Sequence, residues 1–146
     1  MIAALLSDTA AMTTIPAIIL AGGRATRMGG GDKPLRQLGD LPMLRHVLAR
    51  LQPQCGALAI NANGDPARFA GYGLPVIADS MPDYPGPLAG ILAGMDWAAA
   101  QDAPAVLTVA GDTPVFPADL AARLIAAGSA LHLVLAAGRG ADGVQT

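Results

Sequence analysis

The sequence predicts an α/β fold in which a mostly parallel β-sheet is sandwiched by helices. Short apolar runs of four to six residues alternate along the chain with longer segments whose apolar residues recur at helical spacing. Glycine, asparagine or aspartate follows most of the apolar runs. Alternating strands and helices form parallel β-α-β units, and the ligands of such sheets collect at the carboxyl ends of the strands.

Five strands are expected. The first covers residues 15–20, which are β-branched and apolar and are followed by Gly22 and Gly23. Such a run is typical of a strand buried on both faces. The same reasoning predicts strands at residues 57–60, 74–78, 105–110 and 131–136.

Three helices are expected between these strands. The first covers residues 42–52, begins at a proline, which suits a first helical turn, and places four apolar residues on one side: Leu44, Val47, Leu48 and Leu51. The second covers residues 87–100 and is rich in small residues. We expect its core side to carry the larger ones, namely Leu88, Ile91, Leu92 and Met95. The third covers residues 117–127.

Composition and charge exclude several classes of protein. The net charge is −2, whereas a nucleic-acid-binding domain normally carries a strongly basic face, so we expect no nucleic-acid partner. No apolar stretch is long enough to span a bilayer, so we expect no membrane association. Cys55 is the only cysteine, which precludes an internal disulfide and favours a reducing, cytoplasmic location.

The length of 146 residues suits a single domain with one buried core. We expect residues 15–146 to form this nucleotide-binding domain. Residues 1–14 precede the first predicted strand and contain no Lys or Arg, unlike the start of a secretory signal, so we expect a disordered N-terminal extension there.

The stretch LAGGRATRMGGGDKP, residues 20–34, holds five glycines, two arginines and the only lysine of the chain. Glycines let backbone N–H groups point inward around an anion, because they tolerate positive φ and carry no Cβ. Arginine adds a planar fork of donors and lysine a point charge. We therefore predict a triphosphate cradle formed by Gly22, Gly23, Arg27, Gly29, Gly30 and Lys33. The alternative is a flexible, charged hairpin tip.

Polar residues also follow three other predicted strands. Asp112, in the motif GDTP, can hold a divalent cation, although an aspartate before Thr-Pro also suits a turn or a helix cap. Asn61 and Asn63 suit hydrogen bonds to a base or a ribose, but they are equally ordinary turn formers. Asp79 has the same two interpretations.

Two further features carry weaker signals. Residues 84–90 (YPGPLAG) form a rigid entry to a helix, whose N-terminus can face an anion or whose glycines can serve close packing. His46 and His132 lack partners at metal-ligand spacing, so we expect neither to bind a metal.

Together these motifs resemble those of the molybdenum cofactor guanylyltransferases, which are MobA-like nucleotidyltransferases. The resemblance rests on LAGGRATRMGGGDKPL at 20–35, NAN at 61–63, ADSMPDYPGPLAG at 78–90 and GDTP at 111–114. It implies a Rossmann-like nucleotidyltransferase fold and the transfer of GMP from GTP, with Mg2+, to molybdopterin or the molybdenum cofactor, releasing pyrophosphate. It also implies other molybdenum cofactor proteins as partners.

The resemblance assigns roles to individual residues as well. Four residues would approach the guanine and the phosphates: Leu20, Ala21, Gly22 and Gly23. The resemblance further implies that Lys33 binds the phosphates, that Asn61 and Asp79 bind the nucleoside, and that Asp112 binds Mg2+. We add Arg27 because its guanidinium suits phosphate, so the expected catalytic residues are Arg27, Lys33 and Asp112.

The sequence departs from the family pattern at its end. Members of the family are longer, and their later residues supply much of the molybdopterin pocket, whereas this sequence stops at GRGADGVQT, residues 138–146. We therefore expect an incomplete acceptor site. Two alternatives stay open: a guanylyl- or cytidylyltransferase that acts on another phosphorylated acceptor, and a truncated, non-catalytic GTP-binding module.

Overall fold

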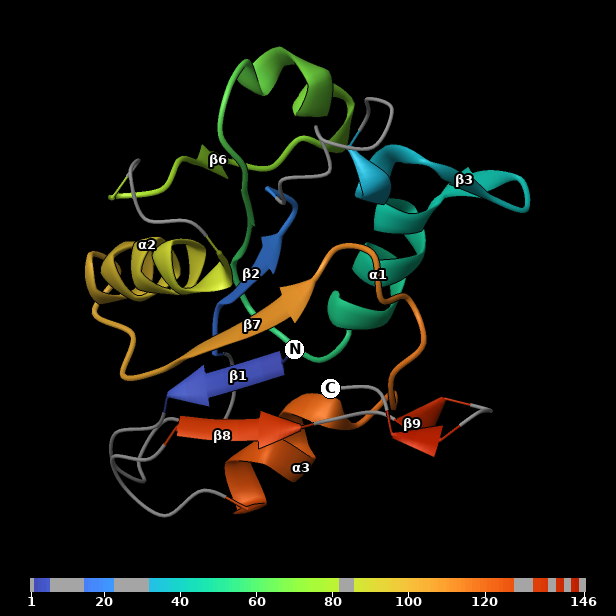
Figure 1. Ribbon diagram of the computed structural model, residues 1–146. Coiled ribbons are helices and arrows are strands. Elements are labelled where there is room, and N and C mark those ends of the chain that lie inside the picture. Colours follow the sequence, from blue (N-terminus) through green and yellow to red (C-terminus); the bar gives the residue numbers. More distant parts are fainter. Residues whose placement is uncertain are drawn as a thin grey trace.

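The computed structural model describes residues 2–5, 15–22, 32–81, 86–127, 133–136, 139–140 and 143–144. Its centre is a six-stranded sheet in the order β6-β5-β2-β7-β1-β8 (Figure 1). In that order the strands are β6 (Val76–Ile77), β5 (Leu58–Asn61), β2 (Ala17–Leu20), β7 (Val106–Ala110), β1 (Ile2–Leu5) and β8 (Leu133–Ala136).

Four neighbouring strands, β6, β5, β2 and β7, are parallel, as the sequence predicts. Strand β2 lies between β5 and β7, with Ile19 in register with Ile60 on one side and Val109 on the other. Because these strands are parallel, their carboxyl ends meet at one edge of the sheet. The predicted polar clusters follow at this edge.

Strand β1 differs from the expectation of a disordered N-terminal extension. Residues 2–5 form a strand that is antiparallel to both of its neighbours, with Ala3 in register with Thr108 of β7 and with Leu135 of β8. The sequence IAAL has little strand propensity of its own, because alanine is depleted in strands, so its pairing with two neighbours determines its conformation. Residues 1 and 6–14 lie outside the described part of the chain.

Helices cover both faces of the sheet and form the predicted sandwich (Figure 1). Helices α1 (Met43–Leu51) and α3 (Leu120–Ala127) pack on one face, where Ala17 and Ile19 of β2 join the main buried cluster. Helix α2 (Pro87–Ala99) packs on the other face against Ile18. Alternate residues of β2 thus point to opposite faces, and this central strand is buried on both.

The predicted core face of α1 is confirmed. Its buried residues are the four apolar ones at helical spacing: Leu44, Val47, Leu48 and Leu51. Helix α3 buries a similar but shorter stripe, formed by Leu120, Ala121 and Leu124.

The predicted core face of α2 is wrong. Leu88 is 60% exposed, and Ile91, Leu92 and Met95 are only partly buried. The buried residues are the small ones: Ala89, Gly90, Ala93, Gly94 and Ala98. Small side chains let the helix axis come close to the sheet, and this close approach displaces the larger residues toward the flanks of the helix.

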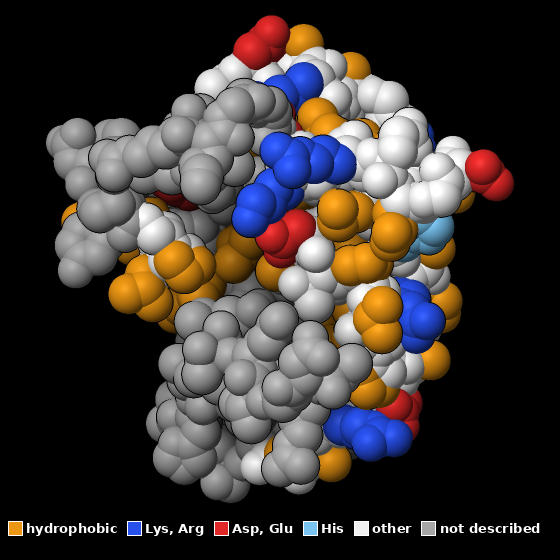
Figure 2. Space-filling view, turned by 45° about the vertical axis from the view of Figure 1, so that its right-hand side comes forward, with side chains coloured by type: hydrophobic (Ala, Val, Ile, Leu, Met, Phe, Trp, Pro, Cys, Tyr) orange, Lys and Arg blue, Asp and Glu red, His pale blue; other side chains and the backbone are white. Residues whose placement is uncertain are grey.

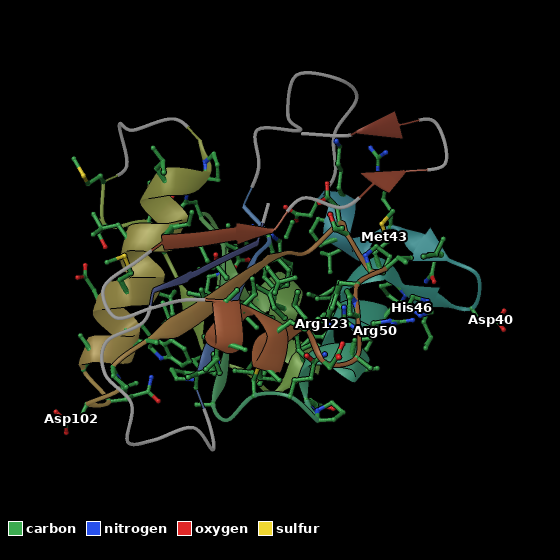
Figure 3. All side chains as sticks on the ribbon, turned by 90° about the horizontal axis from the view of Figure 1, so that it is seen from below. Asp40, Met43, His46, Arg50, Asp102 and Arg123 are labelled. Carbon is green, nitrogen blue, oxygen red and sulfur yellow. The ribbon has the colours of Figure 1, made fainter. Side chains whose placement is uncertain are left out.

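Several short elements escaped prediction. Residues 37–42 form a hairpin of strands β3 (Gln37–Leu38) and β4 (Leu41–Pro42), whose turn contains Gly39 at φ +67°. The ring Nε2 of His46 on α1 lies 2.8 Å from the carbonyl oxygen of Leu38 in this hairpin (Figure 3). The others are the 3-10 helices η2 (Lys33–Leu35) and η3 (Pro66–Tyr72) and the antiparallel pair β9 (Arg139–Gly140) and β10 (Gly143–Val144).

None of the described helices combines the length and the apolar character needed to cross a membrane. Cys55 lies just after α1, half-buried against the core, and its N–H donates to the carbonyl oxygen of Leu51 at 3.1 Å. Burial raises the pKa of the Cys55 thiol from 9.0 to about 11. The thiolate is the reactive form, so the folded protein keeps this thiol in its inert form at neutral pH.

We predict that Cys55 reacts with iodoacetamide at pH 8 about a hundredfold more slowly in the folded protein than in urea, because the raised pKa lowers the thiolate fraction by about that factor. Mass spectrometry of timed samples measures both rates. Equal rates in the two states would contradict the burial of this thiol.

Candidate functional site

Backbone hydrogen bonds hold the carboxyl ends of three parallel strands together. The N–H groups of Ala21 and Gly22, just after β2, both donate to the carbonyl oxygen of Asn61 in β5, at 2.8 and 3.1 Å. On the other side, the N–H of Gly111 after β7 donates to the carbonyl oxygen of Leu20 at 3.0 Å. The described start of the glycine-rich stretch is therefore held between β5 and β7.

Lys33 and Asp112 come from segments that touch each other at this edge. Lys33 begins η2, and the next residue, Pro34, is buried. A Cβ placed on Gly111 would lie 3.0 Å from Cγ of Pro34 and 3.1 Å from its Cβ. The residue after Lys33 therefore packs directly on the residue before Asp112. Both charged side chains are exposed.

Asn61, Asn63 and Asp79 form one hydrogen-bonded network. Nδ2 of Asn61 donates to Oδ1 of Asp79 at 2.9 Å and to the carbonyl oxygen of Ile77 at 3.0 Å, and the Asn61 side chain is fully enclosed. Nδ2 of Asn63 donates to Oδ2 of Asp79 at 2.7 Å, while Oδ1 of Asn63 accepts from the N–H of Asp79 at 2.9 Å. Each oxygen of the Asp79 carboxylate is thus held by one amide, so its orientation is set before any ligand binds.

The first part of α2 packs against this network through Gly90. A Cβ on Gly90 would lie 2.2 Å from Oδ1 of Asn61 and 3.0 Å from Cδ2 of Leu20, so only glycine fits without displacing them. One helical turn later, a Cβ on Gly94 would meet Cγ2 of Ile18 at 2.5 Å. The two glycines thus serve close packing of one helix, but Gly90 faces the strand ends and Gly94 faces the middle of β2.

Sequence reasoning missed Arg68, which the structure places beside this network. Its guanidinium donates to Oδ2 of Asp32 at 2.7 Å and to the carbonyl oxygens of Asp65 and Asn63, both at 2.6 Å. Arg68 follows a Gly-Asp-Pro turn in the sequence, and no motif or spacing there distinguishes it from an ordinary surface arginine.

Charged side chains of both signs gather on the face that Figure 2 presents, where described Lys and Arg side chains lie next to an acidic one. Within the described ranges, no group of three or more His, Cys, Asp or Glu side chains is arranged to hold a metal ion. Asp112 offers one exposed carboxylate, whose Oδ1 accepts a long hydrogen bond of 3.4 Å from the Thr113 hydroxyl. Mg2+ commonly takes only one or two protein carboxylates and completes its shell with water and phosphate oxygens, so this single carboxylate suits Mg2+ that arrives with a polyphosphate.

The structure thus brings together Leu20, Ala21, Gly22, Lys33, Asn61, Asp79 and Asp112 around the ends of β2, β5 and β7. Four other predicted cradle residues lie outside the described part of the chain, namely Gly23, Arg27, Gly29 and Gly30. His132 also lies outside it.

Comparison with known proteins relates this geometry to a family. The family model described as the MobA-like NTP transferase domain matches residues 17–142. A molybdenum cofactor guanylyltransferase from Rhodopseudomonas palustris (strain BisB5) is 60% identical over 111 residues, which are 75% of this chain and 53% of that protein. One from Bradyrhizobium sp. (strain ORS 278) is 56% identical over 117 residues, or 79% of this chain and 55% of that protein. The chain therefore spans about half the length of these relatives.

Solved structures give the same fold. The homolog of Rv0371c from Mycobacterium sp. strain JC1 superposes with a TM-score of 0.60 at 25% identity, covering 77% of this chain and 58% of that one. A nucleotidyl transferase from Methanothermobacter superposes with a TM-score of 0.56 at 17% identity, covering 77% of this chain and 56% of that one. Rv0371c from Mycobacterium tuberculosis, in a complex with manganese, superposes with a TM-score of 0.55 at 22% identity, covering 90% of this chain and 67% of that one.

The family model covers most of the chain and includes every residue of the strand edge described above. The relatives are more than half identical over the same region. This chain belongs to the family of MobA-like NTP transferase domains.

Proposed function

We propose that this protein transfers GMP from GTP to molybdopterin or the molybdenum cofactor, forming the guanine dinucleotide form of the cofactor and releasing pyrophosphate. The observation that carries the proposal is the joint edge of β2, β5 and β7, where Lys33, Asp112 and the Asp79 network meet in a chain of this family. The relatives' name supports the choice of guanine and of the acceptor.

We place the triphosphate against the segment after β2 and beside Lys33. Lys33 is the only lysine of the chain, it is exposed, and it has no ion-pair partner among the described residues. Its ammonium is therefore available to an anion. Arg27 is proposed as a second phosphate donor on its chemistry alone.

Asp112 is the proposed carboxylate for Mg2+, which would offset phosphate charge there. Its exposure at the end of β7 supports this role, and so does the contact between Gly111 and Pro34, which keeps the carboxylate in the neighbourhood of Lys33. One carboxylate suffices for a cation whose other ligands are phosphate oxygens and water.

The proposed reaction needs no acid or base of unusual pKa, because the acceptor phosphate is already an anion. Its main barrier is the meeting of two anions at the α-phosphorus, so the task of the protein is to position them and to stabilise the developing charge. Lys33 and the loop amides supply donors for that charge. Loss of one well-placed donor typically costs about 3 kcal/mol, or roughly a hundredfold in rate.

Asp79 is the proposed receptor for the nucleoside. A carboxylate offers about four lone-pair sites, and Asn61 and Asn63 occupy only part of this capacity. The remaining sites can accept from the N–H groups of guanine or the hydroxyls of ribose. Asn61 then acts mainly through Asp79, because both hydrogens of its amide are already donated within the protein.

Purified protein offered molybdopterin with each nucleoside triphosphate in turn should release pyrophosphate with GTP, and far less with CTP, ATP or UTP. A coupled pyrophosphate assay measures this directly. GTP binding without release would favour a nucleotide-binding module, and release with CTP or with another phosphorylated acceptor would favour a different transferase.

Lys33→Ala should weaken GTP binding about tenfold or more, because a charge-assisted donor is lost, and Asp112→Ala should abolish the effect of Mg2+ on affinity. Titration calorimetry with and without Mg2+ measures both. Variants that bind like the wild type would refute these roles.

The two glycines of α2 differ in what lies against them, so their variants should differ too. Gly90→Ala and Gly94→Ala should each cost about 1–3 kcal/mol of stability through overpacking, partly offset by better helix propensity. Only Gly90→Ala should also weaken GTP binding, by about tenfold, because its methyl group displaces Asn61 and thereby Asp79. Thermal denaturation and calorimetry separate the two effects. Equal affinities for the two variants would contradict the proposed role of the Asp79 network.

A further inference from the structure

Arg68 binds three separate groups through its three guanidinium nitrogens. Nε donates to Oδ2 of Asp32 at 2.7 Å, Nη1 to the carbonyl oxygen of Asp65 at 2.6 Å, and Nη2 to the carbonyl oxygen of Asn63 at 2.6 Å. Its Cζ also lies 4.6 Å from the centroid of the Phe69 ring, which is fully buried. The side chains of Arg68 and Asp32 are each 27% exposed. The guanidinium is thus fixed in one orientation by its bonds and by its stacking.

These bonds join two segments that follow different strands. Asp32 immediately precedes Lys33 and η2, at the end of the glycine-rich stretch after β2. Asn63 lies after β5 and holds the Asp79 carboxylate through its side-chain amide. Asp32 and Arg68 are 36 positions apart in the sequence, so their ion pair is a tertiary link between the proposed phosphate side and the proposed nucleoside side.

The ion pair also changes the charge available to an anion. Asp32 and Lys33 are neighbours in the sequence, and their opposite charges sum to zero. Arg68 adds one positive charge and engages the Asp32 carboxylate directly, which leaves the Lys33 ammonium as the uncompensated group. At this degree of burial, solvent and salt screen the pair less than a fully exposed one.

We propose that Arg68 is a positioning residue for the nucleotide: it anchors Asp32 to the turn after β5, so that Lys33 is held at the strand edge and its charge is free for phosphate. The inference rests on the function proposed above. Arginine is required because its three nitrogens each reach a different acceptor, whereas a lysine at position 68 keeps the charge but has a single nitrogen that cannot reach all three.

The test uses Arg68→Met, Arg68→Lys and the double variant Arg68→Met/Asp32→Asn. Arg123→Met is the matched control, because Arg123 on α3 (Figure 3) also donates through Nε to an aspartate, at 2.8 Å, but in an exposed pair with Asp119, the residue just before α3. Calorimetry measures the affinity of each variant for GTP with Mg2+. Thermal denaturation without nucleotide identifies any variant that fails to fold, in which case Arg68→Lys replaces Arg68→Met in the single and the double variant.

We expect Arg68→Met to bind GTP at least tenfold more weakly than the wild type, Arg68→Lys to recover little, and Arg123→Met to stay within twofold. Adding Asp32→Asn to Arg68→Met should restore at least threefold in affinity, because the unpaired carboxylate beside Lys33 is then gone. Unchanged binding by Arg68→Met would overturn the inference. So would a double variant that binds no better than Arg68→Met, since the loss would then come from local disorder alone.

A second readout works without nucleotide. Selective isotope labelling of lysine gives the NMR signals of one residue, because Lys33 is the only lysine of the chain. These signals should shift in free Arg68→Met, move back toward the wild-type position in the double variant, and stay unchanged in Arg123→Met. If the Lys33 signals have the same chemical shifts in Arg68→Met as in the wild type, the inference is overturned, even if the wild type binds GTP normally. If the signals shift as expected but the wild type binds no nucleoside triphosphate, the function proposed above fails, whereas the link from Arg68 to Lys33 stands.

Discussion

The backbone hydrogen bonds around the end of β2 are the interactions on which the site depends. Ala21 and Gly22 donate to the carbonyl oxygen of Asn61, and Gly111 donates to that of Leu20. Because these bonds join main-chain groups, they fix the relative positions of the three strand ends largely independently of the side chains that follow the strands. The charged residues can then vary in detail while the frame that presents them stays the same. The sheet is the rigid scaffold, and the loops that follow its strands carry the functional side chains.

Close packing of small residues has a second, separate role. Helix α2 approaches the sheet through Gly90 and Gly94, and the segment at Lys33 approaches β7 through Gly111. Because these glycines lack a Cβ, Asn61 packs directly on the backbone at Gly90, Ile18 at Gly94 and Pro34 at Gly111. At Gly90 this packing encloses the amide of Asn61, and the two hydrogen bonds that this amide donates to Ile77 and Asp79 fix its orientation.

Much of the fold follows from periodicity in the sequence, whereas the site follows only in part. Strands β2, β5, β6, β7 and β8 and the three α-helices were predictable because apolar runs and helical spacing are local signals. The buried face of α2 was not predictable. Hydrophobicity favours the burial of Leu88, but the helix packs so close to the sheet that only its small residues fit against the strands. Asp112 and Asp79 stood out because they follow strands. Arg68 did not, because its role arises from a partner 36 positions away, and no local pattern records that pairing.

Strand β1 has a consequence for how the chain folds during synthesis. Ala3 pairs with Thr108 and with Leu135, more than a hundred positions later in the chain, so β1 is synthesised well before either of its neighbours. Until β7 and β8 emerge, this apolar tetrapeptide has no edge to join, and contacts of such long range slow folding because the loop must close first. Shielding of β1 until β7 and β8 are made would therefore assist this protein more than one whose sheet is built from strands that are adjacent in the sequence.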